Sequence, residues 1–362
     1  MDDAYRALRA AYAFPGQPGW VRPAYDGWSI ANLTNSLLAY FGAAHGPVLT
    51  EDAAFAAALG GRRKALVLLL DGLGWDNLAA VAARRPAVAE LFARAWRRPL
   101  TSVAPSTTTA ATTTLTTGLP PSQHGVIGFL MYFPEYARIF NMIGFVTPDA
   151  AHEALCSFGF DPKSYVGAPT LFTLLQGAGV MTGYYTFTQY AGSGLSQLLY
   201  RELPPYPYVA LGDMLSTALE VLRVPRPQVQ LLYWAELDSI AHSVGAGSAG
   251  YATELDMLAG VIERQLLPAL DDDTALIITA DHGHIDGDDR EVIALQEMPD
   301  LTACFRMPPA GEGRMTHLFL RPGTEDAARA ALADAPALLL TKDEFLAHAL
   351  LGPPPLQLEQ HQ

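Results

Sequence analysis

The sequence predicts an α/β protein with a doubly wound, mostly parallel sheet and a smaller cap insertion. Three short apolar runs carry this prediction, at residues 65–70 (ALVLLL), 229–234 (VQLLYW) and 274–279 (TALIIT). Strands that are buried on both faces of a parallel sheet have such nearly continuous apolar sequences. Helical patterns lie between these runs, at residues 77–96, 213–221 and 253–267. Strands that alternate with helices are typical of a doubly wound sheet.

The composition limits the possible functions. Half of the 362 residues are hydrophobic and 17% are charged, which suits a large folded core. The net charge of −14 argues against a nucleic-acid polymer as partner, because an acidic surface repels a polyanion. The chain begins without a basic and apolar leader, and no apolar run approaches the ~20 residues that span a bilayer. We therefore expect a soluble cytoplasmic protein without a membrane partner.

Acidic residues and histidines follow each of the three apolar runs. Asp71 and a glycine follow the first run, Asp238 the second, and Asp281 with His282 the third. Ligands bind beyond the carboxyl ends of the strands in an open parallel sheet, so these side chains are expected at one edge. His242 lies four residues after Asp238 and would share its helix face. Asp71 alone is also compatible with a plain turn, and Asp238 with His242 is compatible with a plain helix pair.

The predicted cluster of carboxylates and imidazoles suits metal ions. Asp and neutral His are ordinary ligands of Zn²⁺, and two metals about 4 Å apart clamp both oxygens of an in-line displacement. The donor types favour two Zn²⁺ ions, with Mn²⁺ or Mg²⁺ as alternatives. Bound cations would also supply the positive charge that this acidic chain needs to hold an anion.

The segment at residues 105–125 (PSTTTAATTTLTTGLPPSQHG) is the most unusual part of the chain. Its β-branched threonines favour a strand, whereas its alanines, Gly118 and the following prolines favour a short, tightly packed helix. The start of such a helix would present backbone N–H groups to an anion, and a hydroxyl beside a metal becomes a nucleophile. A capping cluster without chemistry is the alternative. The composition leaves four candidate hydroxyls: Ser106, Thr107, Thr108 and Thr109.

Residues 129–210 differ from the rest in being rich in aromatic residues, glycine and proline. We interpret them as a cap beside the active edge, because loops carried on a rigid sheet usually determine specificity. The predicted division is therefore a metal-binding α/β core at residues 1–128 and 211–352 and a cap at residues 129–210. The Pro/Gln-rich end, residues 353–362, is expected to be a loose tail.

Five motifs occur in a characteristic order between residues 65 and 320: LLLDGLGWD, PSTTTAATTTLTTGLPPSQHG, ELDSIAHSVG, ITADHGH and GRMTHLFLR. In this order they resemble the alkaline phosphatase superfamily, specifically its type I phosphodiesterase/nucleotide pyrophosphatase branch. That branch has a strand ending in D-G, a nucleophile segment closing in T-G-L-x-P-x-x-H-G, a D-x-x-x-H, a strand ending in D-H-G and a later histidine.

The resemblance implies a nucleophile and two metal sites. The nucleophile falls on Thr108, with Thr107 as the fallback. One metal would be held by Asp71, Asp281, His282 and the Thr108 oxygen, and the other by Asp238, His242 and a third histidine. The later histidine of the family falls on His317, and His284 is the competitor for this role. His124 belongs to the turn after the nucleophile segment and is expected to brace the loop.

One position departs from the family pattern. Nucleotide pyrophosphatases usually carry H-G-I-x-x-N, whose asparagine helps to hold a phosphate oxygen, whereas this chain has Phe129 at that position. Asn141 is the candidate replacement, and a role in a turn is its alternative. We therefore expect Phe129 and Asn141 to contact the substrate.

The resemblance implies a metal-dependent hydrolase that cleaves phosphodiester or pyrophosphate bonds of a small phosphorylated substrate through a phospho-threonine. A phosphomonoesterase, or a phosphonate or sulfate ester hydrolase of the same superfamily, is the enzymatic alternative. From another class, a non-catalytic phosphate- or metal-binding protein on this fold is possible in principle, although such a protein would be expected to lose ligands. The sequence leaves the natural substrate and the oligomeric state open.

Overall fold

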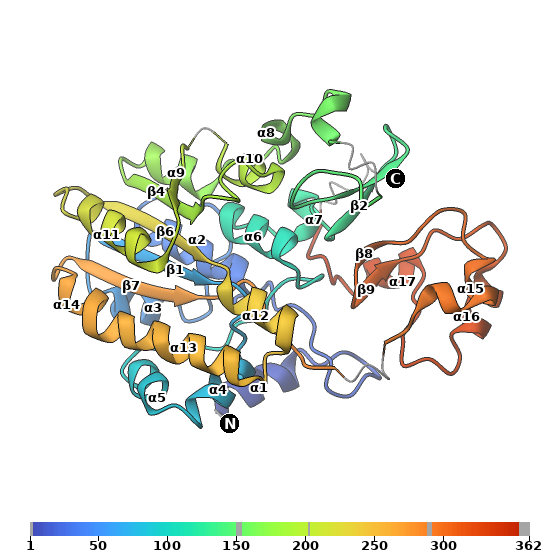
Figure 1. Cartoon of the computed structure of the whole chain (residues 1–362), viewed down its shortest axis with the longest axis horizontal. Coiled ribbons are helices and arrows are strands. Elements are labelled where there is room, and N and C mark those ends of the chain that lie inside the picture. Colours follow the sequence, from blue (N-terminus) through green and yellow to red (C-terminus); the bar gives the residue numbers. More distant parts are fainter. Residues whose placement is uncertain (1–2, 150–153, 202, 288–291, 355–362) are drawn as a thin grey trace.

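A five-stranded parallel sheet forms the centre of the protein (Figure 1). The computed structural model describes residues 3–149, 154–201, 203–287 and 292–354. The strand order is β5-β4-β6-β1-β7, and every neighbouring pair is parallel. These strands are β1 (Lys64–Leu70), β4 (Met181–Phe187), β5 (Tyr206–Tyr208), β6 (Gln228–Trp234) and β7 (Thr274–Thr279). The three predicted strands are therefore confirmed as the adjacent strands β6, β1 and β7.

Helices cover both faces of this sheet. Successive side chains of each strand point to opposite faces, so the apolar strands pack against helices on both sides. On β1, Ala65 and Val67 pack into the hydrophobic core beside α2 (Ile30–Tyr40) and α9 (Leu171–Gly177), which also contains Leu38 and Leu175. Leu68 packs into the core on the other face, together with residues of four helices: α4 (Trp75–Ala82), α5 (Pro86–Ala93), α11 (Leu211–Leu222) and α13 (Ala249–Val261). Burial of each leucine contributes about 2 kcal/mol. The predicted doubly wound α/β architecture is confirmed.

The helices of the described residues range from single turns to thirteen residues. None of them is both long enough and apolar enough to cross a bilayer. They are α1 (Asp3–Ala11), α2 (Ile30–Tyr40), α3 (Asp52–Leu59), α4 (Trp75–Ala82), α5 (Pro86–Ala93), α6 (Thr108–Thr117), α7 (Pro121–His124), α8 (Pro162–Tyr165), α9 (Leu171–Gly177), α10 (Gly194–Tyr200), α11 (Leu211–Leu222), α12 (Glu236–Val244), α13 (Ala249–Val261), α14 (Leu267–Ala269), α15 (Pro299–Thr302), α16 (Glu325–Ala331) and α17 (Lys342–Ala347). Short 3₁₀ turns lie at Leu155–Phe158 and Leu295–Glu297, and a π-helical turn at Ile262–Leu266 joins α13 to α14.

The threonine-rich segment forms the buried helix α6, as its alanines and its closing glycine predicted. Gly118 ends the helix in the left-handed conformation. Inside the helix, the hydroxyls of Thr113 and Thr117 donate to the carbonyl oxygens four residues earlier, at 2.7 and 2.8 Å. These bonds satisfy the buried hydroxyls, so a run that favours a strand by propensity is accommodated as a helix.

Residues 129–210, predicted as a cap, contribute β4 and β5 to the main sheet, and the division of the chain into core and cap stays a prediction. The smaller antiparallel sheet has the order β3-β2-β8-β9 and combines two distant parts of the chain. Its strands are β2 (Leu130–Phe133), β3 (Arg138–Asn141), β8 (Ala310–Glu312) and β9 (Met315–His317). The pairing of Leu130 with Gly311 joins the two halves of this sheet.

The C-terminal part of the predicted core contributes β8 and β9 to this smaller sheet. We call residues 292–350 the C-terminal lobe; it contains β8, β9, α15, α16 and α17 and lies to one side of the main sheet (Figure 1). After the lobe the chain returns to the core, where Ser122 Oγ donates to the carbonyl oxygen of Pro353 at 2.8 Å. Of the predicted loose tail, residues 355–362 lie outside the described residues.

Candidate active site

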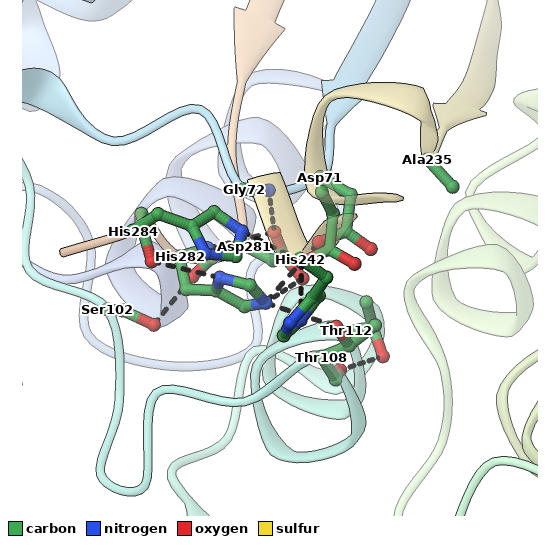
Figure 2. A network of polar contacts seen from close by, with 12 residues as sticks. Asp71, Gly72, Ser102, Thr108, Thr112, Ala235, His242, Asp281, His282 and His284 are labelled. Atoms are coloured by element: carbon green, nitrogen blue, oxygen red, sulfur yellow. Dashed lines mark hydrogen bonds and ion pairs between the residues drawn. The ribbon is translucent and has the colours of Figure 1, made fainter. Parts of the chain in front are cut away.

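The carboxyl ends of β1, β6 and β7 bring the predicted acids and histidines together at one edge. Asp71 directly follows β1, Asp281 follows β7, and His242 lies on α12, which begins just after β6. Figure 2 shows their side chains turned toward one another beside His282 and Thr108. The residues that the sequence placed at a common edge are thus neighbours in space.

His282 Nε2 is the centre of the first ligand group. Three oxygen atoms surround it: Thr108 Oγ1 at 3.1 Å, Asp71 Oδ1 at 3.3 Å and Asp281 Oδ2 at 3.6 Å. Ligand atoms around a tetrahedral Zn²⁺ with bonds of about 2.0–2.1 Å lie roughly 3.3 Å apart. The three distances from Nε2 are therefore close to the spacing of a metal coordination shell, and Asp71, Asp281 and His282 form one of two candidate ligand groups among the described residues.

Burial raises the free-energy cost of ionising the two carboxylates of this group when no cation is nearby. Asp71 and Asp281 are 1% and 0% exposed. Asp71 Oδ1 and Asp281 Oδ2 have no hydrogen-bond partner among the described residues. Burial, and then the neighbouring charge of Asp281, raises the pKa of Asp71, and burial raises the pKa of Asp281 to about 7. Two buried acids that each direct a free oxygen at one point fit a divalent cation, which would favour their ionised forms.

The remaining polar atoms of this group are fixed by neighbours. The backbone N–H groups of Gly72 and His282 donate to Asp281 Oδ1 at 3.2 and 2.8 Å, and the Tyr233 hydroxyl donates to Asp71 Oδ2. His282 Nδ1 lies 3.3 Å from the carbonyl oxygen of Gly283, which can only accept, so this nitrogen carries a proton, and Nε2 is the ring nitrogen that faces the three oxygen atoms. These hydrogen bonds thus hold the other polar atom of each side chain (Asp71 Oδ1, Asp281 Oδ2 and His282 Nε2) facing one position.

The second ligand group centres on Asp238. Asp238 Oδ1 lies 2.9 Å from His284 Nε2 and 3.4 Å from His242 Nε2. Asp238, His282 and His284 form the second candidate ligand group among the described residues. Burial opposes ionisation of Asp238, but the hydrogen bond with His284 and the charge of His242 outweigh it and lower the pKa of this acid. The group is a carboxylate and two imidazoles, which also suits Zn²⁺.

The structure does not bring His317 to either ligand group of the described residues. His317 ends β9 in the smaller sheet, and its ring packs against Phe345 of α17 at a centroid distance of 6.4 Å. The position beside Asp238 is occupied by His284, the competitor. The reason is the location of β9, which belongs to the C-terminal lobe and not to the sheet edge.

The geometry distinguishes Thr108 from its neighbours. Thr108 is the first residue of α6, and its hydroxyl faces His282. Thr107 is the buried N-cap residue, Ser106 is exposed, and the Thr109 hydroxyl donates to the carbonyl oxygen of Gly128 at 2.9 Å. Among the four candidates, Thr108 has its hydroxyl in the first ligand group and stands where the N-terminus of a buried helix attracts an anion.

His124 braces the loop after α6, as predicted. Its Nδ1 accepts from the N–H of Val126 at 3.1 Å, so its Nε2 carries the proton and donates to Thr114 Oγ1 at 2.9 Å. Complete burial lowers the pKa of His124 to about 3. This imidazole is neutral at physiological pH, and both of its nitrogens are already used.

The two predicted substrate contacts have different surroundings. Asn141 Oδ1 accepts from the N–H of Ile143 at 2.8 Å, so this side chain serves the turn after β3, as in the alternative interpretation. Phe129 is half-buried and lines the same large cleft as Thr108. Tyr132 and Phe319, which pack edge to face at 5.6 Å, also line this cleft. The substrate role of Phe129 stays a prediction.

Sequence reasoning missed Tyr233 and Asn77. Tyr233 was part of an apolar run, where its hydroxyl at the end of the strand was the available signal. Asn77 lies in α4, and its carboxamide bonds to the backbone of His284. No local pattern indicates this contact, because it joins loops that are distant in sequence.

One family model and several solved structures are similar to this chain. Residues 65–334 match the family model described as type I phosphodiesterase / nucleotide pyrophosphatase. No curated protein matches the chain. The structure is similar to that of murine ectonucleotide pyrophosphatase / phosphodiesterase 5, with a TM-score of 0.60 and 23% identity over 78% of this chain and 73% of that one. The same values hold for an inactive variant of that protein in complex with AMP. Phosphonoacetate hydrolase from Sinorhizobium meliloti is a more distant match, with a TM-score of 0.47 and 22% identity over 66% of this chain and 62% of that one.

Proposed function

The chain belongs to the type I phosphodiesterase / nucleotide pyrophosphatase family and is a phosphoryl-transfer hydrolase, and from this premise we propose that it cleaves phosphodiester or pyrophosphate bonds through a phospho-threonine at Thr108. One observation carries the proposal. Thr108 Oγ1, Asp71 Oδ1 and Asp281 Oδ2 all lie within 3.1–3.6 Å of His282 Nε2. A hydroxyl inside a set of metal ligands, at the start of a helix, has the surroundings of an activated nucleophile.

We propose that the site holds two divalent cations, with Zn²⁺ favoured by the Asp and His donors. Asp71, Asp281 and His282 would hold one cation together with Thr108, and Asp238 and His242 would contribute to the other. When bound, such cations act as Lewis acids that lower the pKa of a hydroxyl and neutralise charge on phosphoryl oxygens.

The chain's own residues position the reaction. Thr108 Oγ1 forms a bond to phosphorus, and the bond from phosphorus to the leaving oxygen breaks. Water then attacks the phospho-threonine, which releases phosphate or a phosphate monoester and restores the hydroxyl. The N-terminus of α6 favours the anionic group through its backbone dipole, and the fixed position of Thr108 removes much of the entropic barrier.

The cleft beside Thr108 suggests the substrate class. Phe129, Tyr132 and Phe319 supply aromatic surface there, which suits a flat leaving group. The AMP complex of the murine neighbour supports a small nucleotide-type phosphate substrate. We therefore place nucleotide phosphodiesters and pyrophosphates ahead of phosphomonoesters and phosphonates.

The test is the Thr108→Ala variant, measured with metal-reconstituted protein on bis-p-nitrophenyl phosphate. Loss of the nucleophile should lower kcat by a factor of ~10³ or more, because covalent catalysis is removed. Thr116→Ala is the matched control, since that buried hydroxyl of α6 bonds only to the carbonyl oxygen of Thr112 in the described structure. It should retain activity.

Two further readouts complete this test. Acid quenching during turnover should trap phosphate on a peptide containing Thr108 in the wild type and not in Thr108→Ala. Metal content should be measured beside activity. Undiminished turnover by Thr108→Ala with its metal intact would remove Thr108 from the reaction. A panel of phosphomono-, phosphodi- and pyrophosphate substrates would then rank the substrate classes.

A further inference from the structure

Positive charge is scarce in the cleft beside Thr108. The chain carries a net charge of −14, and the two ligand groups place three carboxylates at the sheet edge. Ion pairs with carboxylates already neutralise four arginines that line the cleft: Arg9, Arg94, Arg98 and Arg329. Arg314 also lines the cleft, and within the part of the chain that the structure describes it forms no ion pair. Its charge is therefore available to an anion.

Arg314 lies in the turn between β8 and β9, and its side chain contacts the loop after β7. Its Nη2 donates to the carbonyl oxygen of Ile285 at 3.4 Å. Ile285 directly follows His284, and a Cβ atom on Gly287 would lie 3.7 Å from the same Nη2. The guanidinium therefore lies against the loop that carries residues of both ligand groups.

The hairpin of β8 and β9 packs closely against the segment that leads into β2. Gly311 of β8 pairs with Leu130, and a Cβ atom on Gly128 would lie 2.8 Å from Gly311 Cα. A Cβ atom on Gly311 itself, where φ is +97°, would lie 2.5 Å from the carbonyl oxygen of Met315. Contacts this short leave room only for glycine, so the turn that carries Arg314 is held close to the core.

Asp286 belongs to the loop that Arg314 contacts but uses its carboxylate elsewhere. Its Oδ1 accepts from the N–H of Ala246 at 2.7 Å, and its Oδ2 accepts from the N–H of Gly247 at 2.6 Å. The guanidinium of Arg314 has five N–H donors, and in the described structure the Ile285 carbonyl takes one of them. The planar fork of the remaining donors matches the oxygens of a phosphoryl group, and the guanidinium stays charged in proteins.

Arg314 lies on the side of the site from which a leaving group departs. Thr108 Oγ1 is 3.1 Å from His282 Nε2 in the first ligand group. His282 lies between Thr108 and His284 (Figure 2), and the rings of the two histidines are 5.5 Å apart. Arg314 contacts the loop one residue after His284. The attacking and leaving oxygens lie roughly in line across phosphorus, so a group that departs opposite Thr108 points toward the second ligand group and Arg314.

We propose that Arg314 binds the phosphoryl group that departs with the leaving oxygen, and thereby selects pyrophosphate bonds over esters whose leaving group carries no phosphate. As Thr108 Oγ1 bonds to the first phosphorus, the bond from that phosphorus to the bridging oxygen breaks. The bridging oxygen keeps the electron pair and leaves with the second phosphoryl group, whose charge the guanidinium neutralises. Arg314 is thus a specificity-determining residue. This inference rests on the proposed function and names its substrate class.

A pair of substrates that share one nucleotide tests this role in the full-length, metal-reconstituted protein. Thymidine triphosphate releases pyrophosphate, whereas the p-nitrophenyl ester of thymidine monophosphate releases nitrophenol. Arg314→Ala should lower kcat/KM for the triphosphate by about 10–100-fold, because hydrogen bonds between charged groups are lost. The loss should lie mainly in KM, since the second phosphoryl group is already charged in the bound substrate. The value of kcat/KM for the ester should stay unchanged.

Two further variants make the test specific. Arg314→Lys should recover part of the activity on the triphosphate, because lysine keeps the charge but not the planar fork. Arg306→Ala is the matched control, since Arg306 is another exposed arginine of the C-terminal lobe that lines the cleft. This control should leave the hydrolysis of both substrates unchanged. Melting temperatures verify that each variant is folded.

The outcomes separate this inference from the proposed function. Equal losses for both substrates in Arg314→Ala, or no loss for either, would overturn the role of Arg314 and leave the proposed hydrolase intact. A wild type that cleaves the ester but not the triphosphate would overturn the preference for pyrophosphate bonds in the same way. A folded, metal-loaded wild type that cleaves neither substrate would overturn the proposed function as well.

Discussion

The two ligand groups differ in burial although they share one sheet edge. Asp71 and Asp281 are almost completely buried, whereas the side chain of His242, which lies 3.4 Å from Asp238 of the second group, is 73% exposed. The first group is held by backbone N–H groups and by Tyr233, and the second by a helix and one loop. We therefore expect the proposed cation to exchange slowly at the buried first group and faster at the more exposed second group.

The largest expected effect comes from Asp281→Asn, which keeps the shape of a buried ligand and removes its charge. Activity of the zinc-loaded protein should fall by about 10³-fold or more, because a metal contributes several kcal/mol to transition-state stabilisation. The metal-free variant should melt at a higher temperature than metal-free wild type, since one of two buried like charges is gone. Calorimetry and kinetics measure the two effects. A variant that loses stability in the metal-free form and retains zinc would show that the first group is not a cation site.

Tyr233→Phe should have a smaller effect, confined to the first site. The hydroxyl of Tyr233 bonds Asp71 Oδ2 and leaves Oδ1 directed at His282. Its loss should weaken first-site zinc affinity by about 10–100-fold. Tyr185→Phe is the control, because the buried Tyr185 hydroxyl bonds Gln230 within the sheet. Equal zinc affinities for the two variants would argue against a role for Tyr233 at Asp71.

The smallest expected effect is the pH dependence of stability. Rising pH should lower the stability of the metal-free protein and raise the stabilisation that zinc provides. Burial raises the pKa of Asp281 from 3.8 to about 7 in the folded state. Without metal, the stability that this acid contributes is fully present below its unfolded pKa and is lost as the pH rises through about 7. Zinc binding favours the ionised acids, so the gain in melting temperature on adding zinc should grow from pH 5 to pH 8. Scanning calorimetry with chelator or with zinc measures both trends. A gain in melting temperature that is constant over this range would contradict the buried-acid account.

The sequence predicted the features that depend on local patterns. Apolar runs identified β1, β6 and β7, and the terminal acids placed Asp71, Asp238 and Asp281 at one edge. The alanines and Gly118 predicted α6 despite its threonines. These features follow from the strand and helix periods and from the rule that parallel strands end at a common edge.

The remaining features depend on contacts between distant segments. The strand β4 (MTGYYTF) contains glycine and aromatic residues, so its composition suggested a cap although its position is in the main sheet. The pairing of Leu130 with Gly311 has no local signal, and it places β9 and His317 in the C-terminal lobe. The contact of Asn77 with His284 is equally non-local. The choice between His317 and His284 could not be made from spacing, because it depends on where the lobe lies.

Diffraction from crystals of the zinc-loaded protein, recorded on both sides of the zinc absorption edge, tests the central claim most directly. We predict two anomalous peaks at the sheet edge, one contacting Asp71, Asp281 and His282, and the other contacting Asp238 and His242. Anomalous signal away from this edge, or its absence from a fully folded and zinc-saturated protein, would contradict the account.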